Sequence, residues 1–417
     1  MNNSPTSPGH AVIVGAGIVG LCTAWRLQRD GWQVSVIDQG APGSGASGGN
    51  GTQLSYSYVH PLADASIWRQ LPHLLLSSDS PLTFRPQPDP HQWAWALRFL
   101  VACRTSVSHA TTAQLLTLAA ESRSAFEHML QEEALDCDFA TSGKLVLYPD
   151  ETSFGAAQRQ LDLQRRLGGG LQQAVTPTQC AAIEPALQGY TPHFAGGIHT
   201  PSECAADCLK VCEGLHARLT ARGVRFEVGR RVRGWVREGN RVTAVRTADG
   251  DIRADVFVLA AGTGSARLGA ALGMDVPVYP LKGYSITLPV DTSGNAAPRV
   301  SVTDIARKVV FARLGERLRV AGMVELVGDD RRLPSDRVAS LLTTTRGIFP
   351  ELPTSEAFNP WTGLRPATPT GRPLLGRLPG APENVLLNTG HGALGFTLAM
   401  GSAERLAVAL REAPTPD

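Results

Sequence analysis

A glycine-rich turn near the start of the chain has the spacing of a dinucleotide-binding site. Gly15, Gly17 and Gly20 follow a short apolar run at residues 11–14 and open a helical pattern. In such a turn the first glycine allows the tight bend, the second admits a pyrophosphate to the backbone, and the third lets helix and strand pack closely. Asp38 lies where a carboxylate can accept hydrogen bonds from ribose hydroxyls. These residues predict a dinucleotide site but do not distinguish FAD from a nicotinamide cofactor.

Two further glycine-rich segments could bind anions. Residues 40–51 follow Asp38 as a loop of glycine and serine, which either completes a phosphate cradle or serves as a linker. Residues 388–397, NTGHGALGFT, open the last expected helix, and the start of a helix presents free N–H groups and a positive dipole end. FAD needs a group that offsets negative charge at N1 and C2=O of its reduced ring. The second site therefore favours FAD.

Arg365 stands in an apolar setting, between Trp361 and Pro369 in the stretch WTGLRPATP. A partly buried arginine needs an anion, and its planar guanidinium suits a carboxylate held by two hydrogen bonds. That carboxylate belongs either to a substrate or to an internal Asp or Glu.

The composition excludes several kinds of partner. The 39 Lys and Arg residues nearly balance the 37 Asp and Glu residues, and no basic run occurs, so we expect no nucleic-acid partner. No apolar run reaches the roughly 18 residues that span a bilayer. Residues 1–10 lack the basic start and apolar core of a signal peptide. We therefore expect a cytoplasmic protein whose residues 1–7 are a disordered tail.

The seven cysteines are an odd number scattered along the chain, which indicates reduced thiols. Cys204, Cys208 and Cys212 repeat every four residues, so we expect them on one face of a helix. Structural zinc sites favour close pairs followed by a distant pair, whereas free cysteine packs as a small hydrophobe. We predict core packing and no metal site.

The hydrophobic pattern indicates two kinds of sheet. Short apolar strands are expected at 33–37, 224–228, 255–260 and 385–387, and the third ends in a glycine turn, 260–265, that could return to the nucleotide sheet. Long strands typical of an antiparallel sheet are expected at 278–289 and 308–323.

Read together, these segments resemble the D-amino acid oxidase superfamily of FAD enzymes, and within it the small, FAD-bearing subunit of bacterial D-amino acid dehydrogenases. The resemblance covers nearly the whole chain. Its most specific stretches are VPVYPLKGYSITLP at 276–289, RVAGMVELVG at 319–328, WTGLRPATPTGRPLLG at 361–376 and LNTGHGALGFTLAMGS at 387–402.

The resemblance implies an α/β fold with a discontinuous Rossmann-like FAD-binding domain and an α+β substrate domain whose antiparallel sheet covers the flavin. By this comparison the FAD-binding domain comprises residues 8–60, 200–275 and 355–417, and the substrate domain comprises residues 61–199 and 276–354. No cysteine lies in the C-terminal third, where related sarcosine oxidases attach their flavin, so the FAD is expected to be non-covalent.

The resemblance also implies which residues hold the cofactor. Those expected along the FAD are Gly15, Ala16, Gly17, Ile18, Gly20, Asp38, Gln39, Ser47, Asn50, Gly51, Gln53, Leu54, Val232, Ala261, Gly262, Arg365, Gly390, His391, Gly392, Leu394, Gly395, Phe396 and Thr397.

The implied reaction is the oxidative deamination of a D-amino acid to a 2-oxo acid and ammonia, with hydride transfer from Cα–H to flavin N5. Arg365 matches the arginine that anchors the substrate carboxylate in this superfamily, and Tyr58 and Tyr284 are expected as pocket tyrosines. Positioning, and not a protein base, is expected to assist the transfer. The electrons would pass to a quinone or another acceptor, oxygen included, and a quinone would bring peripheral contact with the inner membrane face.

Two alternatives stay open. One is an oxidase or dehydrogenase of glycine, sarcosine or proline-type secondary amines on the same fold. The other is a non-catalytic FAD subunit of a heteromeric dehydrogenase. A nicotinamide-dependent enzyme is disfavoured by the glycine-rich entry to the last helix.

Overall fold

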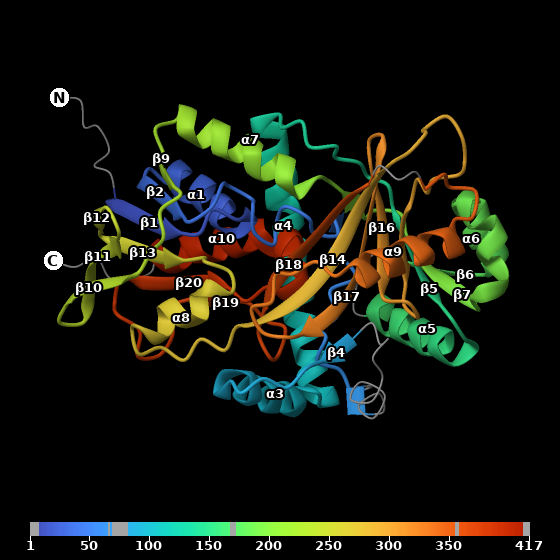
Figure 1. Ribbon diagram of the computed structural model, residues 1–417, viewed down its shortest axis with the longest axis horizontal. Helices are drawn as coiled ribbons and strands as arrows, with labels where there is room; N and C mark the ends of the chain where they lie inside the picture. Colours follow the sequence, from blue (N-terminus) through green and yellow to red (C-terminus); the bar gives the residue numbers. More distant parts are fainter. Residues whose placement is uncertain (1–7, 66, 69–81, 167–171, 355–357, 412–417) are drawn as a thin grey trace.

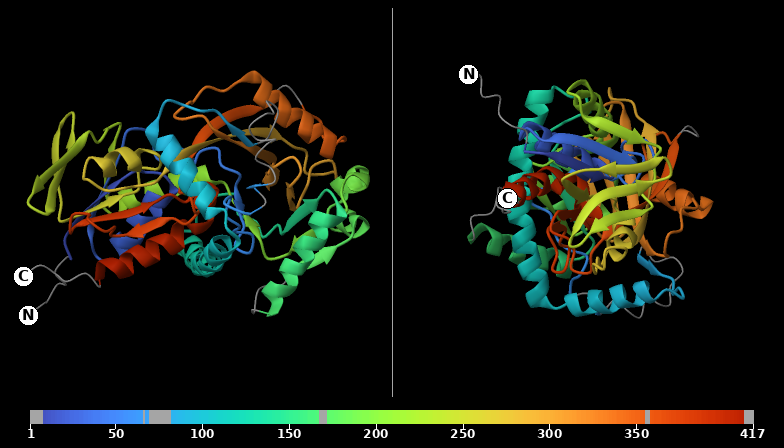
Figure 2. Two further views of the ribbon diagram at one scale, coloured as in Figure 1. Left: turned by 90° about the horizontal axis from the view of Figure 1, so that it is seen from below. Right: turned by 90° about the vertical axis from the view of Figure 1, so that its left-hand side faces the viewer.

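The computed structural model describes residues 8–65, 67–68, 82–166, 172–354 and 358–411. The tail expected at residues 1–7 lies outside these ranges. Two large sheets follow one another along the long axis of the molecule, and helices pack on one face of each (Figures 1 and 2).

The nucleotide sheet is built from segments that are far apart in the sequence. Its six strands run in the order β19-β20-β13-β1-β2-β9 and are parallel except for the edge pair β19–β20. Their bounds are β1 (His10–Val14), β2 (Gln33–Asp38), β9 (Arg225–Val228), β13 (Val256–Leu259), β19 (Leu374–Gly376) and β20 (Val385–Thr389). The strand expected at 255–260 thus returns to the first unit and pairs with β1, as the glycine turn indicated.

Successive residues of β1 point to opposite faces of the sheet, and the four residues from Ala11 to Val14 are all buried, so both faces are covered. Ile13 packs under α1 (Ile18–Arg29) and α10 (Gly395–Arg411), and α4 (Thr105–Glu133) and α7 (Cys208–Ala221) pack on those two helices. Val12 packs on the opposite face, against the meander of β10 (Gly234–Glu238), β11 (Arg241–Thr247) and β12 (Gly250–Arg253) and against α8 (Gly264–Ala270).

One helical segment among the described residues, Gly392–Arg411, is long and apolar enough to cross a membrane. It contains α10, and 56% of its most apolar 18-residue window is buried. Because α10 packs against both α1 and α4, its apolar character is that of a core helix.

The second sheet has nine strands in the order β18-β14-β17-β16-β15-β5-β7-β6, with β4 paired to β17. The bounds are β18 (Asn359–Ala367), β14 (Tyr279–Pro289), β17 (Arg317–Leu326), β16 (Val309–Leu314), β15 (Ser301–Asp304), β5 (Lys144–Tyr148), β7 (Gly196–Thr200), β6 (Gln173–Val175) and β4 (Leu82–Phe84). The pairs β15–β5 and β17–β4 are parallel, so this sheet is mixed and not wholly antiparallel.

The prediction of one continuous strand at 308–323 is wrong. This segment is a hairpin, because the chain reverses at Gly315, whose φ of 57° suits glycine, and β16 then pairs with β17. The strand expected at 278–289 is present as β14.

The two faces of this sheet have different surroundings. On one face, Tyr284, Phe311 and Val320 pack into a core covered by α9 (Ser335–Ile348). On the other, Val310 and Ala321 line a cavity shared with the nucleotide sheet. The parity of each residue along its strand therefore decides whether it reaches that cavity.

The remaining elements complete the fold. They are β3 (Gln53–Leu54), α3 (Pro90–Ala102), α5 (Glu151–Arg166), α6 (Pro177–Ile183), the 3-10 helix η1 (Pro185–His193), β8 (Cys204–Ala205) and the 3-10 helix η2 (Gly392–Leu394). Cys204 thus lies in a strand, and only Cys208 and Cys212 share a helix, which corrects the expected stack of three. All seven cysteines are buried.

Candidate active site

A single cavity of about 1710 Å³ is lined by both sheets. It extends from Asp38, at the end of β2, to Arg365 on β18. The expected site residues that line it are Gly15, Gly17, Ile18, Asp38, Gln39, Ser47, Asn50, Gly51, Gln53, Tyr58, Val232, Ala261, Gly262, Arg365, His391, Gly392, Leu394, Gly395, Phe396 and Thr397.

The glycine turn between β1 and α1 has the shape of a phosphate cradle. Gly15 has a φ of 117°, and a Cβ on Gly20 would overlap the Gly15 carbonyl oxygen. A Cβ on Gly17 would meet only Ser47 Oγ, at 3.3 Å, so the cavity side of Gly17 is open to a ligand. Ser47 Oγ accepts a hydrogen bond from the Ile18 N–H (3.0 Å) at the start of α1. The turn therefore presents backbone and hydroxyl groups to a pyrophosphate.

Asp38 joins the turn to the loop that follows. One carboxylate oxygen accepts the Ala16 N–H at 2.7 Å, and the other accepts the Gly40 N–H at 2.8 Å. A carboxylate oxygen can accept two hydrogen bonds, so Asp38 can still accept hydroxyl donors from the cavity. The residues fit the ADP half of FAD.

The second anion site lies where η2 and α10 begin. His391 is buried, and its Nε2 lies 2.9 Å from Ser402 Oγ. Burial lowers the pKa of His391 to about 3, so its imidazole is neutral at physiological pH. The start of α10, at Gly395, Phe396 and Thr397, opens onto the cavity. A helix N-terminus there offsets negative charge without a charged side chain.

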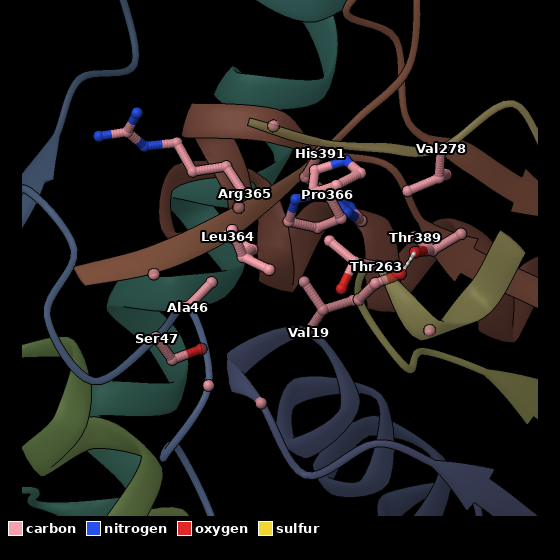
Figure 3. A pocket seen from close by; sticks show the side chains of 18 of the residues that line it. Val19, Ala46, Ser47, Thr263, Val278, Leu364, Arg365, Pro366, Thr389 and His391 are labelled. Atoms are coloured by element: carbon pink, nitrogen blue, oxygen red, sulfur yellow. Dashed lines mark hydrogen bonds between the residues drawn. The ribbon is translucent and has the colours of Figure 1, made fainter. Parts of the chain in front are cut away.

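Arg365 is half-buried in the cavity wall, and its side chain extends away from His391 and Pro366 (Figure 3). Its Nη1 donates to the Met323 carbonyl oxygen at 3.0 Å. The guanidinium lies over Gly283, where a Cβ would overlap it. Within the part of the chain that the structure describes, no carboxylate pairs with Arg365, and desolvation lowers its pKa to about 10. Of the two carboxylates considered as partners of Arg365, an internal Asp or Glu is therefore absent among the described residues, and a substrate carboxylate is left.

Met323 supplies that carbonyl from an unusual backbone conformation. Its φ is 63°, and it lies in a β-bulge where the β14–β17 register shifts between Lys282 and Tyr284. Bulges and left-handed residues next to active sites re-aim backbone groups. Here the bulge directs a carbonyl toward the guanidinium.

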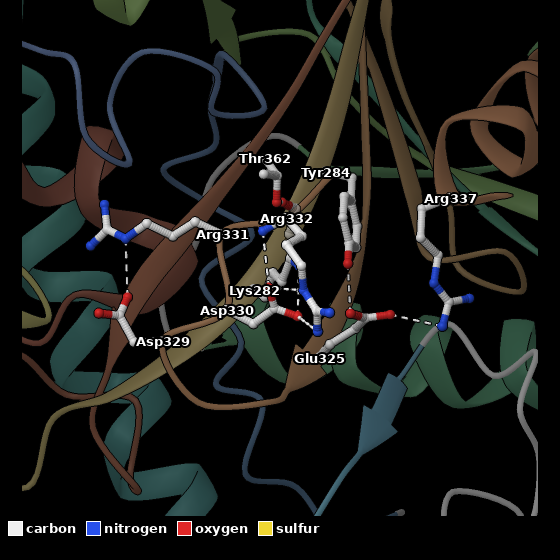
Figure 4. A network of polar contacts seen from close by, with 10 residues as sticks. Lys282, Tyr284, Glu325, Asp329, Asp330, Arg331, Arg332, Arg337 and Thr362 are labelled. Carbon is white, nitrogen blue, oxygen red and sulfur yellow. Dashed lines mark hydrogen bonds and ion pairs between the residues drawn. The ribbon is translucent and has the colours of Figure 1, made fainter. Parts of the chain in front are cut away.

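The two expected pocket tyrosines lie on different faces of the sheet. Tyr58 lines the cavity. Tyr284 points to the opposite face, where its hydroxyl donates to Glu325 Oε2 at 2.6 Å and Glu325 pairs with Arg337 at 2.8 Å (Figure 4). Burial and the bond to Glu325 raise the pKa of Tyr284. The expected pocket role of Tyr284 is thus contradicted, because its position on β14 has the parity of the core-facing residues.

Four of the residues expected along the FAD are packed behind the cavity wall. Ala16 and Leu54 are buried in the core, and the Cβ positions of Gly20 and Gly390 face backbone or side-chain atoms of neighbouring segments. None of the four lines the cavity.

The expectations missed Lys144, which opens β5. It is 3% exposed, and it lines the cavity. Its Nζ donates to Ser55 Oγ at 2.7 Å and lies 4.4 Å from the ring centroid of Tyr58. The available signal was a lysine in KLVLY, a strand with no other charged residue.

One cavity is thus surrounded by a glycine turn, an acid that accepts two backbone N–H groups, a helix N-terminus and a half-buried arginine, which together suit a dinucleotide and a carboxylate substrate. A family model described as FAD dependent oxidoreductase (DAO) matches residues 10–409. A D-amino acid dehydrogenase 2 from Ralstonia nicotianae is 47% identical over 96% of this chain and 96% of its own length. A D-amino acid dehydrogenase 2 from Pseudomonas aeruginosa is 45% identical over 96% of this chain and 95% of its own.

Solved structures show the same fold. Glycine oxidase from Geobacillus kaustophilus superposes with a TM-score of 0.78 at 21% identity, covering 98% of this chain and 95% of that one. L-proline dehydrogenase from P. horikoshii gives 0.74 at 17% identity, covering 98% and 94%. The chain belongs to the DAO family of FAD-dependent oxidoreductases. The expected fold class and cofactor are confirmed, whereas the domain boundaries stay a prediction.

Proposed function

We propose that this protein is a D-amino acid dehydrogenase that converts D-amino acids to 2-oxo acids and ammonia. The observation that carries the proposal is Arg365, a guanidinium in the wall of the FAD cavity whose hydrogen-bonding partner is a carbonyl and whose charge lacks a carboxylate among the described residues. The α-carboxylate of an amino acid supplies that missing anion. The 45–47% identity to two D-amino acid dehydrogenases supports the choice of substrate.

Residues of the chain position the substrate. Arg365 would hold the carboxylate by charge-assisted hydrogen bonds, and its bond to the Met323 carbonyl limits where the guanidinium can lie. Bound FAD would accept the hydride that leaves Cα. His391 is neutral and engaged with Ser402, so we do not assign it as a base. The substrate amine must lose its proton before the hydride leaves, so the rate should rise toward alkaline pH. The imino acid then hydrolyses in water.

We further propose that the protein binds a membrane surface through α3, where a quinone would be within reach as one of the possible electron acceptors. Support comes from an apolar stripe at every fourth position of this helix. Trp93, Leu97 and Val101 are 46%, 64% and 56% exposed, and Trp68 nearby is 51% exposed. Exposed Trp and aliphatic side chains favour the interface between headgroups and acyl chains. Replacing Leu97 and Val101 by serine should reduce co-sedimentation with liposomes, and unchanged co-sedimentation would reject this contact.

The test of the main proposal is anaerobic reduction of the bound flavin. We expect D-amino acids to bleach the absorbance near 450 nm and L-amino acids to leave it unchanged. Arg365→Ala should weaken substrate binding by about 2–5 kcal/mol, with Arg365→Lys intermediate because lysine cannot make a bidentate bond. Reduction by N-methylglycine or proline alone would indicate a secondary-amine enzyme. No reduction by any amine, with dithionite still effective, would indicate a non-catalytic FAD subunit.

A further inference from the structure

Lys144 is a buried cation without an ion-pair partner in the part of the chain that the structure describes. It is 3% exposed, and no carboxylate lies within ion-pair distance of its Nζ among the residues that the structure describes. The carboxylate of Glu203 interacts electrostatically with Lys144, but its two oxygens accept hydrogen bonds from the N–H groups of Tyr56 and Ser57 at 2.6 and 2.7 Å. A buried, uncompensated charge is unfavourable for folding. Because this charge does not stabilise the fold, we expect the role of Lys144 to lie at the FAD site.

The cation is directed at the FAD cavity. Lys144 pairs with Ser301 of β15 and Thr200 of β7, and its side chain lies on the face of the sheet opposite to Leu145 and Leu147, which pack in the core. Ser55 accepts one of the three donors of the ammonium, and the face of Tyr58 attracts the charge.

The segment 53–55, which contains the Ser55 partner of Lys144, also forms part of the cavity wall. Gln53 lines the cavity two residues before Ser55, and its amide donates to the Phe311 carbonyl at 3.1 Å. This bond holds the segment 53–55 against β16. The ammonium of Lys144 is therefore anchored to a segment that borders the FAD site.

We propose that Lys144 stabilises the negative charge gained by the FAD ring on reduction and so raises the reduction potential of the flavin. A substrate Cα–H gives up a hydride, that is two electrons and one proton, and the ring that accepts it becomes singly negative. At an effective dielectric constant of about 20, a unit charge within roughly 12 Å of the ring would change the equilibrium constant for reduction by about tenfold or more. Lys144 would thus act on the bound ring through its charge, from a position in the cavity wall fixed by Ser55 and Tyr58.

The inference rests on FAD binding and deepens the proposed function, because a higher potential favours removal of the hydride. It does not depend on which amine is the substrate. Its test is the reduction potential of the holoenzyme, measured by equilibration with a reference dye, so failure of the proposed substrate would leave this test intact.

The decisive variants are Lys144→Met and Lys144→Arg. Methionine removes the charge and keeps an apolar side chain of similar length, so the fold should tolerate it. At pH 7 we expect Lys144→Met to lower the equilibrium constant for reduction about tenfold, which is about 30 mV for two electrons, and Lys144→Arg to keep most of the wild-type potential. Equal potentials in all three proteins would overturn the proposal.

Lys282→Met is the matched control. Lys282 is as buried as Lys144, lies on the opposite face of the same sheet, and is compensated by Asp330 at 3.5 Å (Figure 4). Its removal should leave the potential within a few millivolts of wild type. A shift as large as that of Lys144→Met would mean that any lysine lost from this sheet has the effect, and the assignment to Lys144 would fail.

A pH series with the wild-type protein provides a second measurement. Desolvation lowers the pKa of Lys144 to about 8, and the titratable or charged groups that face it are Glu203, Tyr58 and His60. The gap between wild type and Lys144→Met should therefore shrink between pH 7 and pH 9.5. A gap that stays constant over this range would show that the charge of Lys144 is not its cause.

Discussion

Gly283→Ala isolates the position of Arg365 from its charge. A Cβ at Gly283 would lie 2.5 Å from Nη1 of Arg365 and closer still to Nη2 and Cζ, whereas ordinary contacts begin at 3.4 Å. The guanidinium must therefore move by about 1 Å, away from the place where it donates to Met323. A misplacement of about 1 Å costs about 100-fold in rate, which corresponds to about 2.7 kcal/mol. We expect kcat/KM for a D-amino acid to fall by this factor.

The assay is steady-state turnover with an artificial acceptor, combined with the Kd of a carboxylate inhibitor from the flavin difference spectrum. FAD content should be unchanged, because Gly283 is not part of the phosphate cradle. Gly347→Ala is the control, since nothing lies within 4 Å of its Cβ position on α9 and alanine there should stabilise the helix slightly. Wild-type Kd and kcat/KM in Gly283→Ala would refute the role of Arg365 as a positioned carboxylate anchor.

Three further predictions concern stability and cofactor binding. Gly20→Ala should weaken FAD binding at least tenfold, measured by fluorescence titration, because its Cβ overlaps the Gly15 carbonyl oxygen; full FAD occupancy would contradict this. Lys144→Met should raise the free energy of unfolding by about 2 kcal/mol at pH 7. Removing the desolvated charge, which lowers the pKa of Lys144, gains about 3 kcal/mol, and losing the hydrogen bond to Ser55 costs about 1 kcal/mol. The unfolded state binds more protons between pH 8 and 10.5, so the gain in the urea midpoint should fade across that window, and a pH-independent gain would count against it. Glu133→Ala should lower the free energy of unfolding by about 3 kcal/mol, because Glu133 is buried and accepts from Trp25 (2.6 Å) and from both terminal nitrogens of Arg222 (2.6 and 2.8 Å); Glu132→Ala, at a more exposed pair, should have little effect on the same urea curve.

The local features of the site could be predicted from the sequence. The glycine turn, Asp38 and the glycine-rich start of α10 depend on backbone conformation and on the N–H groups of a helix, and both are properties of a few consecutive residues. Arg365 could be singled out because a charged group among apolar neighbours is unusual at any position. For these residues, type and spacing already limit the chemistry.

The tertiary structure decided which side chains share the cavity. Strand parity indicates that Tyr284 and Ile286 face the same way, but not which face of the sheet meets the FAD site. That depends on α9 covering one face and the nucleotide sheet approaching the other. The same packing directs Tyr284 to Glu325 and Lys144 to the cavity. No expectation from the sequence singled out Lys144. Contacts between residues far apart in the chain are a property of the assembled layers, so no local pattern contains them.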